Sequence, residues 1–98
     1  MWQSTGPMQN LNDLRDFVQK TLCEQHQLEV GAFPMTERIL LRSGKPCGVY
    51  FCLHGPRAVK VSAIWETERN SILFYGATGE RLVKVQLVAA PKLEGVAA

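Results

Sequence analysis

Residues 49–66 read VYFCLHGPRAVKVSAIWE and contain two alternating runs on either side of a Gly-Pro turn. In both runs the odd-numbered residues are apolar: Val49, Phe51 and Leu53 in the first, and Val59, Val61, Ala63 and Trp65 in the second. This period-two alternation is typical of strands with one covered and one solvated face. Because parallel strands need a crossover of about a dozen residues, the short connection predicts an antiparallel hairpin.

Further patterns on both sides of this stretch complete the predicted fold. The predicted strands are residues 37–42, 49–54, 58–66, 71–76 and 81–88, although residues 72–75 (ILFY) are apolar on both faces and leave their facing open. Between residues 10 and 29 apolar side chains recur at helical spacing, which predicts a helix capped by Asn10 or Asn12. The predicted fold is α+β, with one N-terminal helix packed on one face of a four- or five-stranded antiparallel meander sheet.

The length of 98 residues suits one domain with a core of its own. We expect a single domain at residues 10–90, a flexible N-terminal tail at 1–9 and a frayed C-terminal tail at 91–98. No stretch approaches the ~18–20 apolar residues of a membrane span, and no secretory signal pattern is present. Three cysteines cannot all pair within one chain, so we expect a reduced, cytoplasmic protein.

Charge is distributed unevenly along the chain. Residues 1–34 carry two basic and four acidic side chains, a net of −2, whereas residues 35–98 carry nine basic and five acidic side chains, a net of +4. This places the positive charge on the predicted sheet. The bias is mild compared with the basic density of an electrostatic nucleic-acid binder.

Two cysteine–histidine pairs match a tetrahedral zinc set in composition. Cys23 and His26 stand three residues apart on the predicted helix, and Cys52 and His54 share one strand face. Cys23, however, falls on the polar arc of the helix, which predicts a surface thiol, and Cys52 falls on the sheet face opposite the helix. The four side chains therefore lie on different sides of the sheet, and we predict no metal and no other cofactor.

Cys52 and His54 could also act by themselves as a nucleophile and its base. Two residues apart on a strand, they are separated by about 6.6–6.8 Å of strand rise, whereas a thiol–imidazole pair needs a hydrogen bond of about 3 Å. A small hydrophobic role for the cysteine is the simpler interpretation.

Two glycine turns carry basic side chains, residues 44–48 (GKPCG) and 54–57 (HGPR), and backbone amides beside a cation can hold a phosphate. Neither turn matches a phosphate-loop pattern, and neither leads into a helix. Both are fully explained as hairpin turns.

The sheet face opposite the predicted helix, called the open face below, mixes cations with aromatic and apolar side chains. It could be simply solvated, bind a protein or peptide, or hold single-stranded nucleic acid by phosphate pairing and base stacking. Protein contact or dimerisation is favoured over RNA if the face also presents Leu40, Ile64, Leu73 and Leu82. The candidate binding residues are Arg38, Arg42, Tyr50, Cys52, His54, Lys60, Ser62, Tyr75, Lys84 and Gln86.

No acid–base, metal or nucleotide motif converges on one part of the chain, so the sequence favours a non-catalytic function. The leading hypothesis is a small interaction module that binds a protein or peptide partner, or a second copy, through the open face or an edge strand. The alternative is single-stranded nucleic-acid binding by Arg38, Arg42, Lys60 and Lys84. A thiol enzyme built on Cys52 is a third hypothesis, and no membrane association is predicted.

Overall fold

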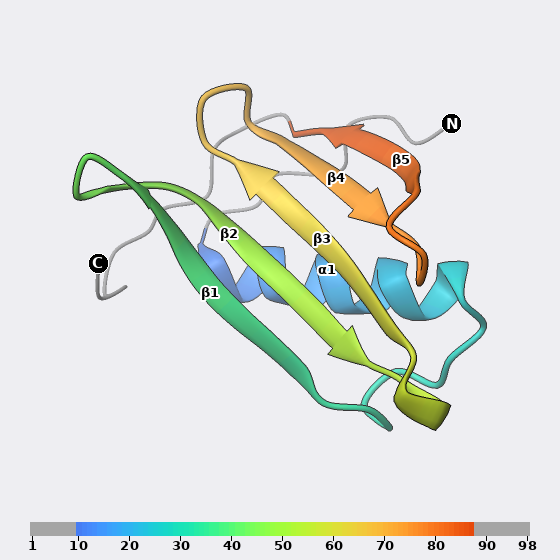
Figure 1. Cartoon of the computed structure of the whole chain (residues 1–98). Coiled ribbons are helices and arrows are strands. Elements are labelled where there is room, and N and C mark those ends of the chain that lie inside the picture. The colour runs from blue at the N-terminus through green and yellow to red at the C-terminus, as the bar shows by residue number, and fades with distance from the viewer. Residues whose placement is uncertain (1–9, 88–98) are drawn as a thin grey trace.

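One helix and a sheet of five antiparallel strands make up residues 10–87, the part of the chain that the computed structural model describes (Figure 1). The elements are α1 (Leu11–Gln25), β1 (Met35–Arg42), β2 (Lys45–His54), the 3-10 turn η1 (Pro56–Ala58), β3 (Lys60–Glu66), β4 (Ser71–Tyr75) and β5 (Arg81–Gln86). The strands lie in the order β1-β2-β3-β4-β5, so each pairs with its neighbour in the sequence. The predicted α+β meander is confirmed. The predicted tails, 1–9 and 91–98, lie outside the described residues.

The helix begins at a predicted cap but ends earlier than predicted. The side chain of Asn10 accepts a hydrogen bond of 2.9 Å from the backbone of the first turn. At the other end Gln27 adopts a left-handed conformation with φ 57°. Leu28 N then donates to Cys23 O at 2.8 Å, and Gln27 N donates to Glu24 O at 3.4 Å. These two bonds form a Schellman motif, whose left-handed position is usually glycine. Because glutamine occupies that position here, the sequence does not indicate that the helix ends there. The predicted end at residue 29 was therefore wrong.

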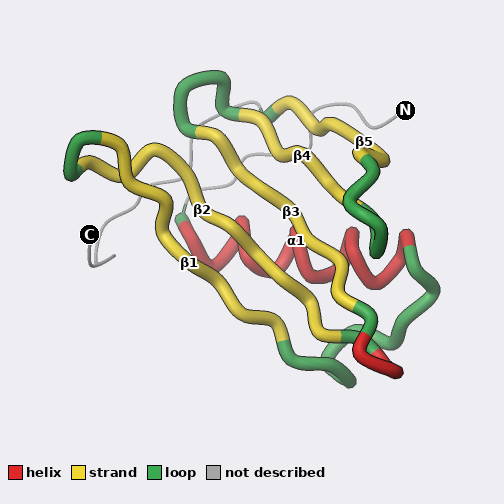
Figure 2. Tube along the Cα trace, viewed as in Figure 1, coloured by secondary structure: helices red, strands yellow, loops and turns green. Residues whose placement is uncertain are grey.

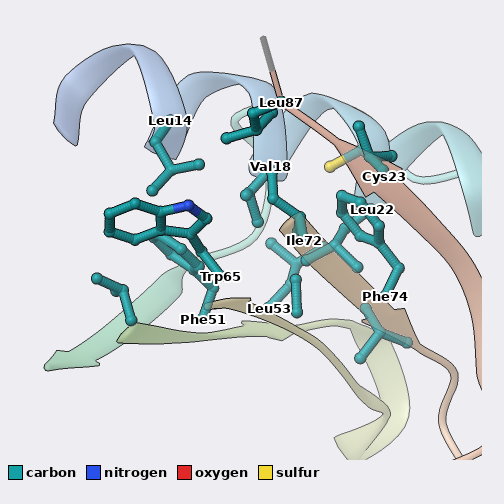
Figure 3. Close-up of a cluster of buried hydrophobic side chains, with 14 residues drawn as sticks. Leu14, Val18, Leu22, Cys23, Phe51, Leu53, Trp65, Ile72, Phe74 and Leu87 are labelled. Carbon is teal, nitrogen blue, oxygen red and sulfur yellow. The ribbon is translucent and has the colours of Figure 1, made fainter. Parts of the chain in front are cut away.

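The hydrophobic core lies between α1 and the sheet face that carries the odd-numbered residues of β2 and β3. Figure 3 shows Leu14, Val18 and Leu22 on the helix facing large side chains of the sheet. The largest of these, all fully buried, are Trp65, Phe51, Phe74, Leu53 and Ile72. Since burial of apolar surface contributes about 25 cal/mol per Å², this layer holds the helix on one face and leaves the other face open.

The structure settles the facing of the apolar run in β4. Ile72 and Phe74 point into the core with no exposed surface, so Leu73 and Tyr75 lie on the open face. Val59, which the alternation placed among the covered residues, is instead 38% exposed. The reason is that η1 interrupts the chain after β2 and β3 begins only at Lys60.

Cys23 is buried rather than exposed, so its prediction as a surface thiol was wrong. Only 1% of the residue is accessible, and it belongs to the hydrophobic core cluster. The connection from α1 to β1 folds back over the last turn of the helix, and Cys23 Sγ lies 4.0 Å from Glu29 O. Burial raises the pKa of the Cys23 thiol, which makes it a poor nucleophile.

The β1–β2 connection is a two-residue turn rather than the loop expected at residues 43–48. Ser43 and Gly44 both have positive φ, 53° and 78°, as a tight type I′ hairpin requires. The strand therefore resumes at Lys45, and a register shift between Leu40 and Leu41 absorbs the irregularity near the tip. As a result, the β1–β2 hairpin extends beyond the end of β3, which pairs with β2 only from Gly48 onward.

Gly48 is buried in β2, where it pairs with Glu66 of β3. A Cβ atom at this position would lie 2.4 Å from the backbone oxygen of Trp65. Because that oxygen belongs to the main chain of the neighbouring strand, it cannot move aside as a flexible side chain would. Glycine is therefore required here for space, not for its freedom in φ.

A two-pronged ion pair ties the helix to the edge strand β1. Arg15 Nε donates to Glu37 Oε1, and Arg15 Nη2 donates to Glu37 Oε2 at 2.8 Å. The hydrogen bond to Glu37 is the main cause of the raised pKa of Arg15.

Within residues 10–87 no helix is both long and apolar enough to cross a membrane.

We predict that Gly48→Ala destabilises the fold, because β2 and β3 must separate to admit the methyl group. The free energy of unfolding should fall by about 1–3 kcal/mol, as for other overpacked sites, measured by urea denaturation. Gly55→Ala is the matched control, since the Cβ there would meet its nearest atom, Val59 O, at an ordinary 3.4 Å. Equal stability of the two variants would contradict the proposed close approach.

Candidate functional site

Three rows of paired residues cross all five strands on the open face, and one of them joins Leu40, Gly48, Glu66, Ser71 and Gln86. The strand register places Arg38, Tyr50, Ile64, Leu73 and Lys84 side by side in another row, called the central row. The same pairing places Thr36, Cys52, Ser62, Tyr75 and Arg81 in the adjacent row, called the second row. With strands about 4.8 Å apart, each row is about 19 Å long.

The central row has a cation at each end and an apolar middle. Its three inner residues, Tyr50, Ile64 and Leu73, are half-buried, whereas Arg38 and Lys84 are exposed. The Arg38 guanidinium lies 5.7 Å from the centroid of the Tyr50 ring, within the range of a cation–π contact. The row therefore combines an apolar contact surface with charge at its two margins.

The second row is more polar, and its centre is less accessible. Cys52 is only 7% exposed, and Ser62 and Tyr75 are half-buried. At one end of the sheet His54 Nε2 lies 3.0 Å from Thr36 Oγ1 across the β1–β2 pair, and His54 stands opposite Lys60.

Nine of the ten predicted binding residues lie on the open face: alternation assigned eight of them to it, and the ninth, Tyr75, had its facing left open by the sequence. One of the nine, Gln86, turns its amide away to donate to the backbone oxygens of Arg69 and Asn70 at 2.8 and 3.1 Å. The tenth, Arg42, lies near the tip of the β1–β2 hairpin, past the register shift at which Cys47 of β2 has no partner in β1. It lines a groove at the end of the open face.

This groove, of about 740 Å³, lies at one end of the open face. The β1–β2 and β3–β4 turns stand at that end of the sheet (Figure 2). Thr67 links the β3–β4 turn to β2, since its backbone N–H and its hydroxyl both donate to Cys47 O, at 3.1 and 3.0 Å. The groove is lined by Leu40, Arg42, Lys45, Pro46, Cys47, Ile64, Trp65, Glu66, Thr67, Glu68 and Arg69.

The groove has an apolar wall and a charged rim. Leu40, Pro46 and Ile64 are half-buried, and they supply the apolar surface. The rim carries three cations, Arg42, Lys45 and Arg69, and two carboxylates, Glu66 and Glu68. The salt bridge found among residues 10–87 joins Arg15 to Glu37, neither of which lines the groove. No charged residue of the rim therefore forms a salt bridge with a described residue.

Sequence reasoning missed most of the groove because it treated residues 43–48 as a loop. A Ser-Gly pair between two strand-like runs is compatible with a two-residue turn, and that assignment would have extended β2 to Lys45. Lys45, Pro46 and Cys47 would then have been placed beside Ile64. Arg81 of the second row was missed as well, because an irregularity between Phe74 and Tyr75 shifts the register of β5.

The cysteine–histidine pairs lie in separate places. Cys23 and His26 are at the end of α1, and Cys52 and His54 are on the opposite side of the sheet. Within the described residues no three His, Cys, Asp or Glu side chains are grouped to hold a metal ion. The open face and the groove offer apolar contact, cations and a few hydrogen-bonding groups.

Comparison of the chain with protein-family models, with curated proteins and with solved structures finds no match.

We predict that Cys47 is the thiol that reacts first in the native protein. It is half-buried in the wall of the open groove, whereas Cys23 is 1% and Cys52 7% exposed. Brief treatment with iodoacetamide at neutral pH, followed by mass spectrometry of the peptides, should find carbamidomethyl groups on Cys47 before the other two. Preferential labelling of Cys52 would contradict this order and revive the thiol-enzyme hypothesis.

Proposed function

We propose that this chain is a small, non-catalytic interaction module that binds a protein partner through the open face, in the reducing cytoplasm. The observation that carries the proposal is the central row, in which Arg38 and Lys84 flank the half-buried Tyr50, Ile64 and Leu73. Such a row complements a partner segment that presents apolar side chains between carboxylates. The three free cysteines are in keeping with a reducing compartment.

Charge on the open face supports an acidic partner. Among the described residues of the central and second rows, the charged side chains are all basic: Arg38, Lys84 and Arg81. Lys60 adds a further cation beside His54 at the edge of the second row. Opposite charge across an interface accelerates association and excludes wrong partners, so a basic margin around an apolar strip selects an acidic, apolar segment.

A second copy bound face to face is a poorer fit. A two-fold axis parallel to the strands would bring Arg38 of one copy against Lys84 of the other. An axis across the strands would bring Arg38 against Arg38. Each arrangement places like charges together at the ends of the central row, which is destabilising.

Single-stranded nucleic acid is the second candidate, and the contact of Arg38 with the Tyr50 ring is the observation that favours it. Cations beside aromatic rings can pair with phosphates and stack on bases. Glu66 and Glu68 lie at one end of the same face, however, and would repel any anionic group placed beside them. A nucleic acid carries a negative charge at every linkage, whereas a polypeptide can present uncharged residues there, so we rank nucleic acid below an acidic polypeptide.

The proposal can be tested with a fluorescein-labelled peptide that carries Leu and Glu at helical spacing, compared with the same peptide carrying Lys in place of Glu. Fluorescence anisotropy should detect binding of the acidic peptide. The double variant Arg38→Glu/Lys84→Glu should weaken binding by about ten-fold or more, because two attractive contacts become repulsive. Lys20→Glu, on the exposed surface of α1, is the matched charge control and should leave binding unchanged.

Three results would overturn the proposal. The first is absence of binding by the acidic peptide, and the second is an equal effect of the Lys20 control. The third is preferential binding of a labelled oligouridine with a steep loss of affinity as salt increases, which would establish the nucleic-acid alternative. A solution mass that rises with concentration would show self-association and would make a second copy the partner instead.

A further inference from the structure

The groove beside the β1–β2 hairpin is continuous with the central row, because Ile64 belongs to both. We infer that the groove is an anchor pocket, which receives an apolar side chain of the bound acidic segment together with a neighbouring carboxylate. This inference rests on the proposed function and adds to it the place and the chemistry of the strongest contact.

The size and lining of the groove support an anchor. A volume of about 740 Å³ exceeds that of a single side chain and can take an apolar residue with its neighbours. Leu40, Pro46 and Ile64 offer the apolar contact, and residues that fill such pockets contribute most of the binding energy in protein interfaces. The rim cations Arg42, Lys45 and Arg69 stand where a flanking carboxylate would be neutralised.

The mixed charge of the rim distinguishes a polypeptide from a polyphosphate. Glu66 and Glu68 can accept hydrogen bonds from backbone N–H groups of a bound peptide. Every linkage of a nucleic acid carries a negative phosphate, and its backbone has no N–H group. The rim therefore suits a chain that offers carboxylates and N–H groups in alternation.

The groove is also held open before any partner arrives. The two-residue turn at Ser43 and Gly44 defines the hairpin tip, and Thr67 bonds twice to Cys47 O from the facing turn. A pocket whose walls are already fixed loses little conformational entropy on binding, which favours affinity.

Cys47 provides a reporter inside the groove, since the other two cysteines of the chain are buried. With the acidic peptide at about ten times its Kd, alkylation of Cys47 by iodoacetamide should slow about ten-fold, because only the unoccupied fraction reacts. Conversely, prior reaction of Cys47 with N-ethylmaleimide should fill the groove and weaken peptide binding by at least about ten-fold. The variant Cys47→Ala, treated with the same reagent, should bind as well as it does untreated.

The outcomes separate the two proposals. If the acidic peptide binds and depends on Arg38 and Lys84, but Cys47 reacts at the same rate and its alkylation leaves the affinity unchanged, then the anchor pocket is refuted and the proposed function stands. If the peptide fails to bind the untreated protein, the proposed function fails and the anchor pocket with it. Equal loss of affinity in treated Cys47→Ala would place the reagent's effect elsewhere and also refute the pocket.

Discussion

One-sided burial of the sheet by α1 is the constraint on which the rest of the structure depends. Leu14, Val18 and Leu22 cover Trp65 and its neighbours, and this apolar layer packs α1 against the sheet. Because strand side chains alternate, every residue committed to that layer sends the next residue to the opposite face. Which residues lie on the open face is therefore a direct consequence of which residues lie in the core.

What such a face does depends on how its own residues line up across the strands. The central row places cations at its two ends, with an aromatic ring and two aliphatic side chains between them. The result is a shallow apolar strip that is stable in water, and it gains most from a partner that supplies both apolar contact and negative charge.

Much of this arrangement could be predicted from alternation alone. The facing of Tyr50, Cys52, Lys60 and Lys84 follows from period two, and the cap at Asn10 follows from the chemistry of its side chain. The failures occur where backbone geometry overrides residue type. Gln27 takes a left-handed position that usually belongs to glycine, so the end of the helix carried no signal.

Tertiary contacts account for the other failures. Cys23 stands on the polar arc of α1, yet the connection that leaves the helix returns to cover it. The groove depends on how far one hairpin extends past the next strand, which is a relation between elements that lie apart in the sequence. Neither effect can be derived from the periodicity of a single segment.

The length of the β1–β2 hairpin can vary independently of the core. Its tip, from Lys45 to Cys47, lies beyond the strand pairing of β3 and away from the helix. Adding or removing residues two at a time, one from each strand, would lengthen or shorten one wall of the groove without disturbing Trp65 or Val49. A change in one strand alone would reverse the facing of the tip residues. A change in hairpin length could thus alter the proposed binding groove while the fold stays the same.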